Sequence, residues 1–281
     1  MVKFYLELYT ITNISNFDDI KEGNMEQYSM INVNYENGVA YIGMNRQEAR
    51  NALNYQLLDE IMHACIDADN CEEIGVVVLY SQVPSVFCAG ADIKERRSMT
   101  DEEVVKRRQF ARDVYSTLEN LEKPLIVAVD GKCIGGGCEI IGSADLIFSS
   151  DISTFRYVEV AVGSVGATQR VTRLVGRQHA NDLLFSSRTI DAEEAWHMGL
   201  VARMFKQEEF MTNVTETAEK IASYPRVTLL ATKKAIKMAA YTSPEQGVMF
   251  EQMAIGYNLA KNDWRGSLDN FKQTTKKENG K

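Results

Sequence analysis

The sequence is short of several features that mark particular classes of protein. No part of it approaches the roughly 18 uninterrupted apolar residues of a membrane-spanning helix. The formal net charge is −8, so the chain lacks the surplus of Lys and Arg that nucleic-acid phosphates require. We therefore expect neither a membrane nor a nucleic acid as a partner, although a few local basic side chains could still hold the phosphates of a small molecule.

Cysteine and histidine are also too sparse, and too widely spaced, for a zinc site. The five cysteines contain no Cys-x-x-Cys pair, and the three histidines complete no zinc pattern with them, so we expect no metal. The N-terminus lacks a basic region followed by an apolar run and a small-residue cleavage site. Together with an odd cysteine count, this indicates a protein of the reducing cytoplasm.

Hydrophobic patterning predicts one large domain in which strands and helices alternate. Asn37-Gly38 predicts a tight hairpin because both residues tolerate positive φ, Gly176 predicts a helix end, and Asp191 with Glu194 predicts a helix cap. Strands are expected at 30–35, 39–44, 74–80, 124–130 and 144–149, and helices at about 57–68, at 101–121 and through most of the chain after about 166. This alternation indicates an α/β protein. The polar residues 1–29 predict a poorly ordered extension.

The most informative segment runs from Lys123 to Glu139. It reads as a buried strand and a turn, followed by the glycines Gly135, Gly136 and Gly137 at the mouth of a helix. Glycine lets a ligand approach the backbone closely, and the free N–H groups of a helix N-terminus suit an oxyanion or a phosphate. Taken alone, the glycine run is equally compatible with a tightly packed turn.

A second segment, Val86 to Glu95, also places small residues after a buried strand. Cys88, Ala89 and Ala91 leave the backbone of this loop open to a ligand. Two backbone donors that converge on one carbonyl oxygen are what thioester enolate chemistry requires. Taken alone, this segment is more simply a surface loop that enters a helix.

The order of these segments, with Asn45 to Leu53 upstream and Thr168-Gln-Arg170 downstream, resembles the crotonase (enoyl-CoA hydratase/isomerase) superfamily over roughly residues 31–275. The resemblance implies the α/β crotonase (ClpP-like) fold, in which repeated ββα units form a spiral core, here residues 30–225. It also implies a C-terminal helical region at 226–281 that packs in the oligomer, a homotrimer or a dimer of trimers.

The resemblance further implies an enzyme that adds water to a 2-enoyl-CoA. Ala91 and Gly136 would donate backbone hydrogen bonds to the thioester oxygen, while Glu139 and Glu159 would hold the water. Coenzyme A would enter as part of the substrate, with no separate cofactor. The positions implied to bind it are Arg50, Cys88, Ala89, Ala91, Asp92, Ile93, Lys94, Gly135 and Gly136. For the side chains of Arg50 and Lys94, a solvated surface charge is an equally good interpretation.

Local sequence features support catalytic roles for the two glutamates less strongly than the family resemblance does. Glu139 falls in the first turn of a helix among apolar neighbours, where a carboxylate is partly desolvated and suited to acid–base chemistry. Glu159 stands alone in the apolar run Val158 to Val162, so it is either functional or turned towards solvent on a half-exposed element.

Two departures from the family pattern lie around Glu159. The stretch from Val160 to Ala167 is about three residues shorter than in typical hydratases, and Tyr157-Val158 replaces the usual pair that ends in proline. Because this loop lines the acyl pocket, double-bond isomerisation, decarboxylation and thioester hydrolysis remain alternatives. A binding or scaffold protein that has lost turnover is a further one. The acyl group and the pathway are not encoded in any pattern of the sequence.

Overall fold

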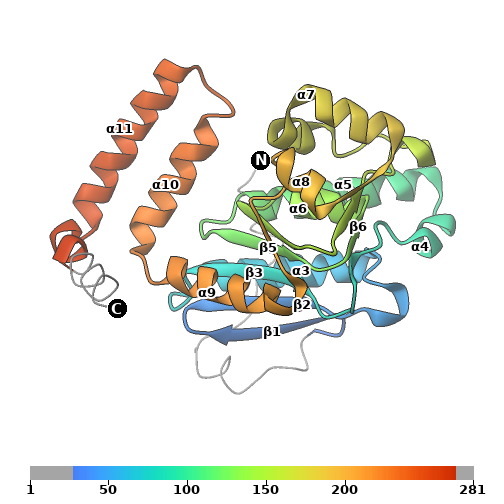
Figure 1. Ribbon diagram of the computed structural model, residues 1–281, viewed down its shortest axis with the longest axis horizontal. Helices are drawn as coiled ribbons and strands as arrows, with labels where there is room; N and C mark the ends of the chain where they lie inside the picture. Colours follow the sequence, from blue (N-terminus) through green and yellow to red (C-terminus); the bar gives the residue numbers. More distant parts are fainter. Residues whose placement is uncertain (1–27, 270–281) are drawn as a thin grey trace.

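The computed structural model describes residues 28–269, and within them two β-sheets are flanked by helices (Figure 1). The larger sheet has the strand order β1-β2-β3-β5-β7-β10, and the smaller has the order β4-β6-β8-β9. The strands are β1 (Ile31–Glu36), β2 (Val39–Met44), β3 (Val76–Ser81), β4 (Val86–Cys88), β5 (Leu125–Val129), β6 (Lys132–Ile134), β7 (Leu146–Ser150), β8 (Thr154–Arg156), β9 (Thr189–Asp191) and β10 (Arg203–Phe205). Only the pairs β1–β2 and β8–β9 are antiparallel among these described strands.

Helices lie on both faces of the larger sheet and also pack against the smaller one. They are α3 (Tyr55–Asn70), α4 (Ile93–Arg97), α5 (Asp101–Glu119), α6 (Gly136–Ile141), α7 (Thr168–Ser186), α8 (Ala192–His197), α9 (Phe210–Ala222), α10 (Arg226–Met238) and α11 (Pro244–Lys261), with short 3₁₀ turns η1 (Gln47–Ala49), η2 (Val160–Val162) and η3 (Gln207–Glu209). Side-chain caps fix several of their starts: Asn54 accepts from the Leu57 N–H, and Asp191 accepts from the Glu194 N–H. The cap predicted at Asp191 is therefore confirmed.

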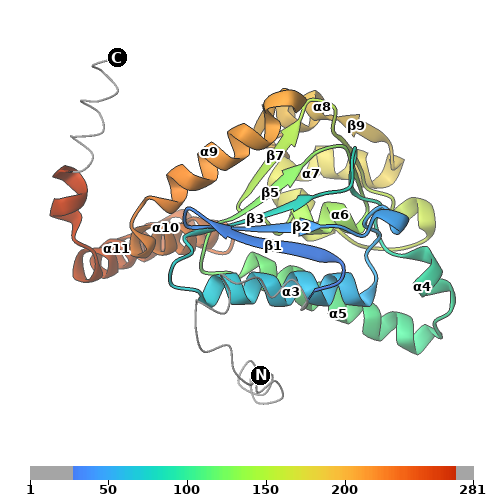
Figure 2. The same ribbon diagram turned by 90° about the horizontal axis from the view of Figure 1, so that it is seen from below.

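Alternating side chains of each parallel strand serve two different apolar layers. On β3, Val77 and Leu79 belong to the main core with α3 and α5, whereas Val76 and Val78 pack with Phe210 of α9 on the opposite face. Figure 2 shows the sheet edge-on between these helices, with α9 on one side and α3 and α5 on the other. Burial on both faces explains why these strands read as continuous apolar runs in the sequence.

Most of the predicted elements are confirmed, and the differences have clear physical reasons. The Asn37-Gly38 turn joins β1 to β2 with φ of 49° and 77°, as a tight hairpin requires. After residue 166 the chain is not wholly helical, because β9 and β10 are present there. Each has only three residues, too few for a periodic signal. Gly176, with φ 75° and ψ 164°, is non-helical and separates two helical segments that meet at a kink within α7, so the helix end predicted there is confirmed.

Helices α10 and α11 pack on each other and extend away from the rest of the molecule (Figure 1). The predicted boundary after residue 225 falls just before α10, and the division into domains remains a proposal. The extension predicted at 1–29 lies outside the described residues except for its last two. Among residues 28–269, no helix has the length and apolar character needed to cross a bilayer.

Candidate active site

Strands β4 and β6 bring the two candidate backbone donors to one place. The strands pair in parallel, with Val86 opposite Lys132 and Cys88 opposite Cys133. Because parallel strands end at the same edge of a sheet, the segments that follow them, 89–92 and 135–137, leave the sheet side by side.

The direction of the Ala91 N–H is set by a backbone bridge to Leu53. The Leu53 N–H donates to the Gly90 carbonyl (2.7 Å), and the Asp92 N–H donates to the Leu53 carbonyl (3.0 Å). In such a parallel bridge the residue between the two bonded groups turns its own N–H to the opposite side. The Ala91 N–H accordingly has no acceptor among residues 28–269 and is available to a ligand.

Gly136 supplies the second free donor. As the first residue of α6, it has an N–H without an intrahelical acceptor, and no other residue between 28 and 269 accepts it. A Cβ on Gly136 would stand 3.6 Å from the Ala91 nitrogen and 2.9 Å from Leu53 Cδ1. The two unpaired donors thus lie next to one another, at a point too crowded for an added methyl group, and can bind a single oxygen together.

The flanking glycines are required for different reasons. Gly135 has φ 49° and ψ −109°, a conformation that residues with a Cβ rarely adopt, and its N–H donates to the Arg156 carbonyl at 2.9 Å. At Gly137 a Cβ would stand 2.8 Å from Cys88 Cβ, so this glycine permits close packing of α6 against β4. Of the three, only Gly136 combines an unpaired N–H with a position beside Ala91.

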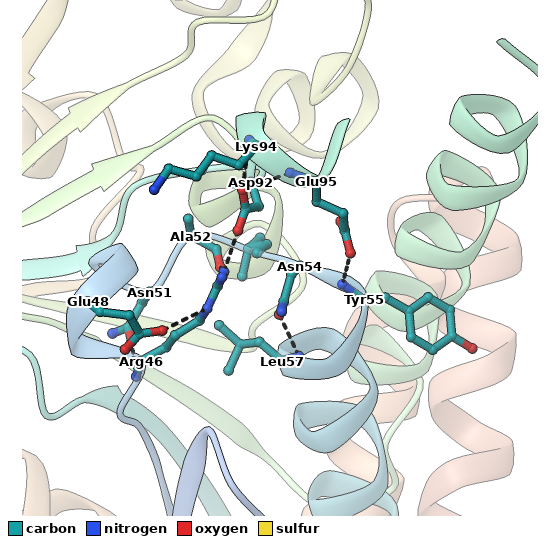
Figure 3. Close-up of polar contacts among 12 residues, drawn as sticks. Arg46, Glu48, Asn51, Ala52, Asn54, Tyr55, Leu57, Asp92, Lys94 and Glu95 are labelled. Carbon is teal, nitrogen blue, oxygen red and sulfur yellow. Dashed lines mark hydrogen bonds and ion pairs between the residues drawn. The ribbon is translucent and has the colours of Figure 1, made fainter. Parts of the chain in front are cut away.

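An ion pair anchors the loop that carries Ala91 (Figure 3). Asp92 caps α4 by accepting from the N–H groups of Lys94 (2.9 Å) and Glu95 (3.1 Å), and its other oxygen lies 2.6 Å from Arg46 Nη1. The same nitrogen of Arg46 donates to the Ala52 carbonyl at 2.6 Å. The guanidinium therefore holds together the two backbone segments that form the bridge.

Asn51 fixes the other side of this network. It is fully buried, accepts from the Arg46 N–H (2.9 Å), and donates to Ser81 Oγ (2.9 Å) and to the Phe87 carbonyl (3.1 Å). These bonds join the segment after β2 to β3 and β4. A satisfied buried amide of this kind rigidifies its surroundings.

Glu139 lies in the first turn of α6 and is held by two partners. Its Oε1 accepts from the Ala167 N–H at 2.5 Å, and its Oε2 lies 3.6 Å from Arg170 Nη1. Arg170 also pairs with Glu119 at 3.0 Å. The side chain of Glu139 is 17% exposed, so this carboxylate is partly desolvated while a cation and an N–H face it.

Glu159 has the opposite surroundings. It is only 9% exposed, and its Oε2 finds no hydrogen-bond partner in the described part of the chain. Burial raises the pKa of Glu159, the charge of Glu139 raises that pKa further, and the Arg108 guanidinium opposes the rise. Of the two interpretations of this residue from the sequence, the solvent-facing one is wrong.

The loop from Val160 to Ala167 brings the two carboxylates to one glycine. A Cβ on Gly166 would stand 3.2 Å from Glu139 Oε1 and 3.2 Å from Glu159 Cγ. Arg108 of α5 fastens this loop: it donates to Ser164 Oγ at 2.8 Å and to the Val165 carbonyl. The loop therefore lies against both glutamates and is tied to α5.

The residues expected to bind coenzyme A fall into two groups. Arg50, Ile93 and Lys94 are exposed beside the 88–91 segment, where their side chains are open to a ligand. Cys88 is buried against Gly137, and the Asp92 carboxylate is taken up by Arg46 and its own helix, so either residue could meet a ligand only through its backbone. The Ala89 N–H donates to the Arg50 carbonyl at 3.1 Å.

Four residues of the site were given no role by sequence reasoning, although two of them lie in the matching motifs: Arg46, Arg108, Tyr115 and Arg170. Arg108 and Tyr115 are seven residues apart, two turns along α5, a spacing that puts both on one face of the helix. That spacing was readable in the sequence. The sequence did not show what this helix face packs against, because the facing loop comes from residues more than fifty positions away.

Comparisons with known proteins agree with this geometry. A family model described as enoyl-CoA hydratase/isomerase matches residues 34–280. The chain is 35% identical over 246 residues to a short-chain-enoyl-CoA hydratase of Clostridium acetobutylicum, covering 86% of this chain and 94% of that protein. It is 31% identical over 251 residues to an enoyl-CoA isomerase/hydratase of Mycosarcoma maydis, covering 85% and 91%.

A solved structure is similar over the same extent. The enoyl-CoA hydratase from Bacillus anthracis superposes with a TM-score of 0.84 at 30% sequence identity. The match covers 88% of this chain and 97% of that one.

Proposed function

Because the chain belongs to the enoyl-CoA hydratase/isomerase family and has the crotonase fold, we propose that it adds water to the double bond of a 2-enoyl-CoA. The observation that carries the proposal is the placement of two carboxylates around Gly166 in a site that also holds two unpaired backbone N–H groups. The site can then serve both requirements of hydration. The N–H groups stabilise negative charge on the thioester oxygen, and the carboxylates transfer the protons as water adds across the α- and β-carbons.

The backbone donors act on the thioester. The N–H groups of Ala91 and Gly136 bind its carbonyl oxygen and draw electrons from the double bond, so the β-carbon becomes electrophilic. As water attacks that carbon, negative charge moves to the oxygen and an enolate develops. Donors aimed at such an oxygen contribute about 10²–10³-fold each to the rate.

The different surroundings of the glutamates assign their roles. Glu139, which faces Arg170 and the Ala167 N–H, acts as the carboxylate that takes a proton from water as its oxygen bonds to the β-carbon. Glu159, whose pKa is raised by burial, donates its proton to the α-carbon. The product is a 3-hydroxyacyl-CoA. The proton left on Glu139 returns to Glu159 through the next water, which restores the starting state.

Coenzyme A enters as part of the substrate, and the proposal requires no further cofactor. Arg50 and Lys94, exposed beside the 88–91 segment, are the basic side chains best placed for its phosphates or pantetheine arm. Gly135 and the backbone from Cys88 to Ile93 complete the proposed binding strip.

The test is hydration of crotonyl-CoA, followed as the loss of its conjugated-enoyl absorbance, with Glu139→Gln and Glu159→Gln beside the wild type. Turnover that collapses in both variants supports the proposal. A wild type that binds CoA esters without turnover points instead to isomerisation, decarboxylation or hydrolysis, for which the shortened loop is the structural reason. Failure to exchange the α-proton of a bound acyl-CoA would leave only a binding role.

We also propose that the protein is a homotrimer or a dimer of trimers in the cytoplasm. The exposed apolar residues of α10 and α11, among them Ile236, Val248, Met249 and Met253, support an oligomer. Light scattering that gives three or six times 31.6 kDa is the expected result, and a monomer would contradict it.

A further inference from the structure

Tyr115 of α5 is a largely buried tyrosine, only 8% exposed, whose hydroxyl bonds to no other described residue. Its oxygen is not among the fully enclosed polar atoms that lack a partner, as the Tyr157 hydroxyl is, so it remains accessible at the surface of the core. A hydroxyl that is accessible and not used by the protein can form a hydrogen bond to a bound ligand.

The hydroxyl lies close to the two backbone donors. Its oxygen is 3.3 Å from the position that a Cβ on Gly136 would occupy, and the Ala91 nitrogen is 3.6 Å from that same position. The Tyr115 hydroxyl, the Ala91 N–H and the backbone of Gly136 therefore surround one small region. Leu53 Cδ1, at 2.9 Å from the same point, closes its apolar side.

Packing accounts for the ring of Tyr115 but not for its oxygen. The ring belongs to the main apolar core, and the Arg170 guanidinium lies over it at 6.0 Å. A phenylalanine would keep both contacts. The hydroxyl is thus the part of the side chain that only the site can use.

The charge environment makes this hydroxyl a donor. Burial raises the pKa of Tyr115 well above its usual range, and the negative charge of Glu139 raises that pKa further. The phenol therefore keeps its proton throughout the working pH range of the protein. A neutral phenol beside a developing oxyanion stabilises it by hydrogen bonding.

We propose that the Tyr115 hydroxyl donates a third hydrogen bond to the thioester oxygen of the substrate, beside the N–H groups of Ala91 and Gly136. Tyr115 is on this account a catalytic residue that contacts the reacting group, and its bond strengthens as the enolate forms. The inference deepens the proposed function and rests on it for the identity of the substrate.

The experiment uses Tyr115→Phe, which removes only the hydroxyl, with Tyr41→Phe as the matched control. Tyr41 is equally buried, at 9% exposure, but packs in the apolar layer with α9 on the far side of the sheet. Two readouts are taken. The first is kcat and KM for crotonyl-CoA. The second is the apparent pKa of bound acetoacetyl-CoA, measured from the absorbance of its enolate, which reports stabilisation of the oxyanion without turnover.

We expect Tyr115→Phe to lower kcat by about tenfold or more with little change in KM. We also expect it to raise the apparent pKa of bound acetoacetyl-CoA by about one unit, the same tenfold expressed as an equilibrium. Tyr41→Phe should change neither value. Because the hydroxyl has no protein partner, the melting temperature of Tyr115→Phe should not fall, which separates loss of the hydrogen bond from loss of the fold.

An unchanged kcat together with an unchanged enolate pKa in Tyr115→Phe overturns the inference. If the wild type stabilises the enolate and Tyr115→Phe weakens it, but crotonyl-CoA is not hydrated, the hydratase proposal fails while the role of Tyr115 stands. A wild type that does not shift the acetoacetyl-CoA equilibrium at all contradicts both.

Discussion

Arg46 and Asp92 form an ion pair, 2.6 Å between Nη1 and Oδ2, at the residue that follows the backbone donor of Ala91. Their side chains are 15% and 8% exposed, so the pair lies largely out of water. Neither side chain forms a hydrogen bond or ion pair with Glu139 or Glu159, so the effect of the Arg46–Asp92 pair on the reaction passes through the backbone. It keeps the Leu53–Ala91 bridge in register.

Breaking this pair should cost both stability and turnover. Asp92→Asn keeps a good helix cap but removes the buried counter-charge of Arg46, leaving only the exposed Glu48, and removal of one partner of a buried pair costs about 3 kcal/mol. We expect kcat for crotonyl-CoA to fall more than KM rises, because the oxyanion donor is displaced. Glu48→Ala is the control, since it removes the exposed partner of Arg46, 3.2 Å away. Equal effects of the two variants would contradict this account.

The same pair predicts a dependence of stability on acid. Burial is the largest single influence and raises the pKa of Asp92, but the hydrogen bond and charge of Arg46 together with the N–H groups of Glu95 and Lys94 outweigh it and lower the pKa. A carboxyl whose pKa is lowered by folding stabilises the folded state at pH values above its pKa in the unfolded chain, about 3.9. This contribution is lost as the pH falls through the lowered pKa of the folded state. Melting temperatures of the wild type and Asp92→Asn should therefore converge below about pH 4.

The pH dependence of stability contributed by Glu159 should have the opposite sign to that of Asp92. The carboxyl needed for activity should therefore lower the stability of the fold at neutral and alkaline pH. Its raised pKa means that the folded state binds the proton more tightly than the unfolded state. The resulting stability is present at low pH and is lost as the pH rises from about 4.3 through the raised value. Glu159→Gln removes this loss, so its melting temperature should exceed that of the wild type at pH 8 but not at pH 4.

Activity of that variant should fall by at least about 10²-fold, since the acid for the α-carbon is gone. In the wild type, kcat should decrease on the alkaline side as Glu159 ionises. Glu216→Gln, an exposed position on α9, serves as the control for both measurements. A Glu159→Gln variant that is active, or less stable than the wild type at pH 8, would remove the basis for assigning Glu159 as the acid.

Gly166→Ala should inactivate the enzyme while leaving it folded. The new methyl would stand 3.2 Å from Glu139 Oε1 and from Glu159 Cγ, where it displaces the carboxylates or their water. We expect kcat to drop by up to about 10²-fold, because misplacement of catalytic groups by about 1 Å has effects of this size. Gly163→Ala, in the same loop, has no atom within 4 Å of its Cβ but a φ of 66°, so it reports backbone strain alone. Comparable losses of activity in the two variants would point to loop strain instead.

Arg108→Ala should loosen the loop that faces the glutamates. Without the bonds to Ser164 and Val165, the segment loses its tie to α5. We expect KM for crotonyl-CoA to rise and the dependence of kcat/KM on acyl-chain length to change, measured across a series of 2-enoyl-CoA esters. Arg112→Ala, one turn along the same helix, is the control, because Arg112 pairs only with Asp113 in the described structure. An unchanged chain-length profile in Arg108→Ala would rule out a role for this clamp in specificity.

The sequence predicted those parts of the fold and site that depend on local pattern. Strands β2, β3 and β5 are continuous apolar runs, and Gly135–Gly137 with the segment around Ala91 carry a motif whose order is specific. The three-residue strands β9 and β10 escaped prediction because they are too short to show a period. Their pairing is decided by tertiary contacts.

The charged residues around the site could not be predicted for a different reason. Arg46 meets Asp92 across 46 positions of chain, and Arg108 meets Ser164 across 56. Nothing within a window of neighbouring residues distinguishes these arginines from solvated ones. Burial decides between the two, and burial is a property of the assembled fold. The same holds for Glu159, whose apolar neighbours left two interpretations open until its exposure was known.

The bridge between Leu53 and Ala91 has a consequence for how this catalytic apparatus can vary over evolution. The donor at position 91 is a main-chain group, oriented by bonds made at Gly90 and Asp92, and the Ala91 side chain is exposed. The position of this N–H therefore depends on the backbone pairing and not on which side chain residue 91 carries. A saturation mutagenesis screen should tolerate small polar replacements at 91 while rejecting changes at its two neighbours. Selection can thus change the side chains that face the substrate around residue 91 while the backbone N–H donor stays in place.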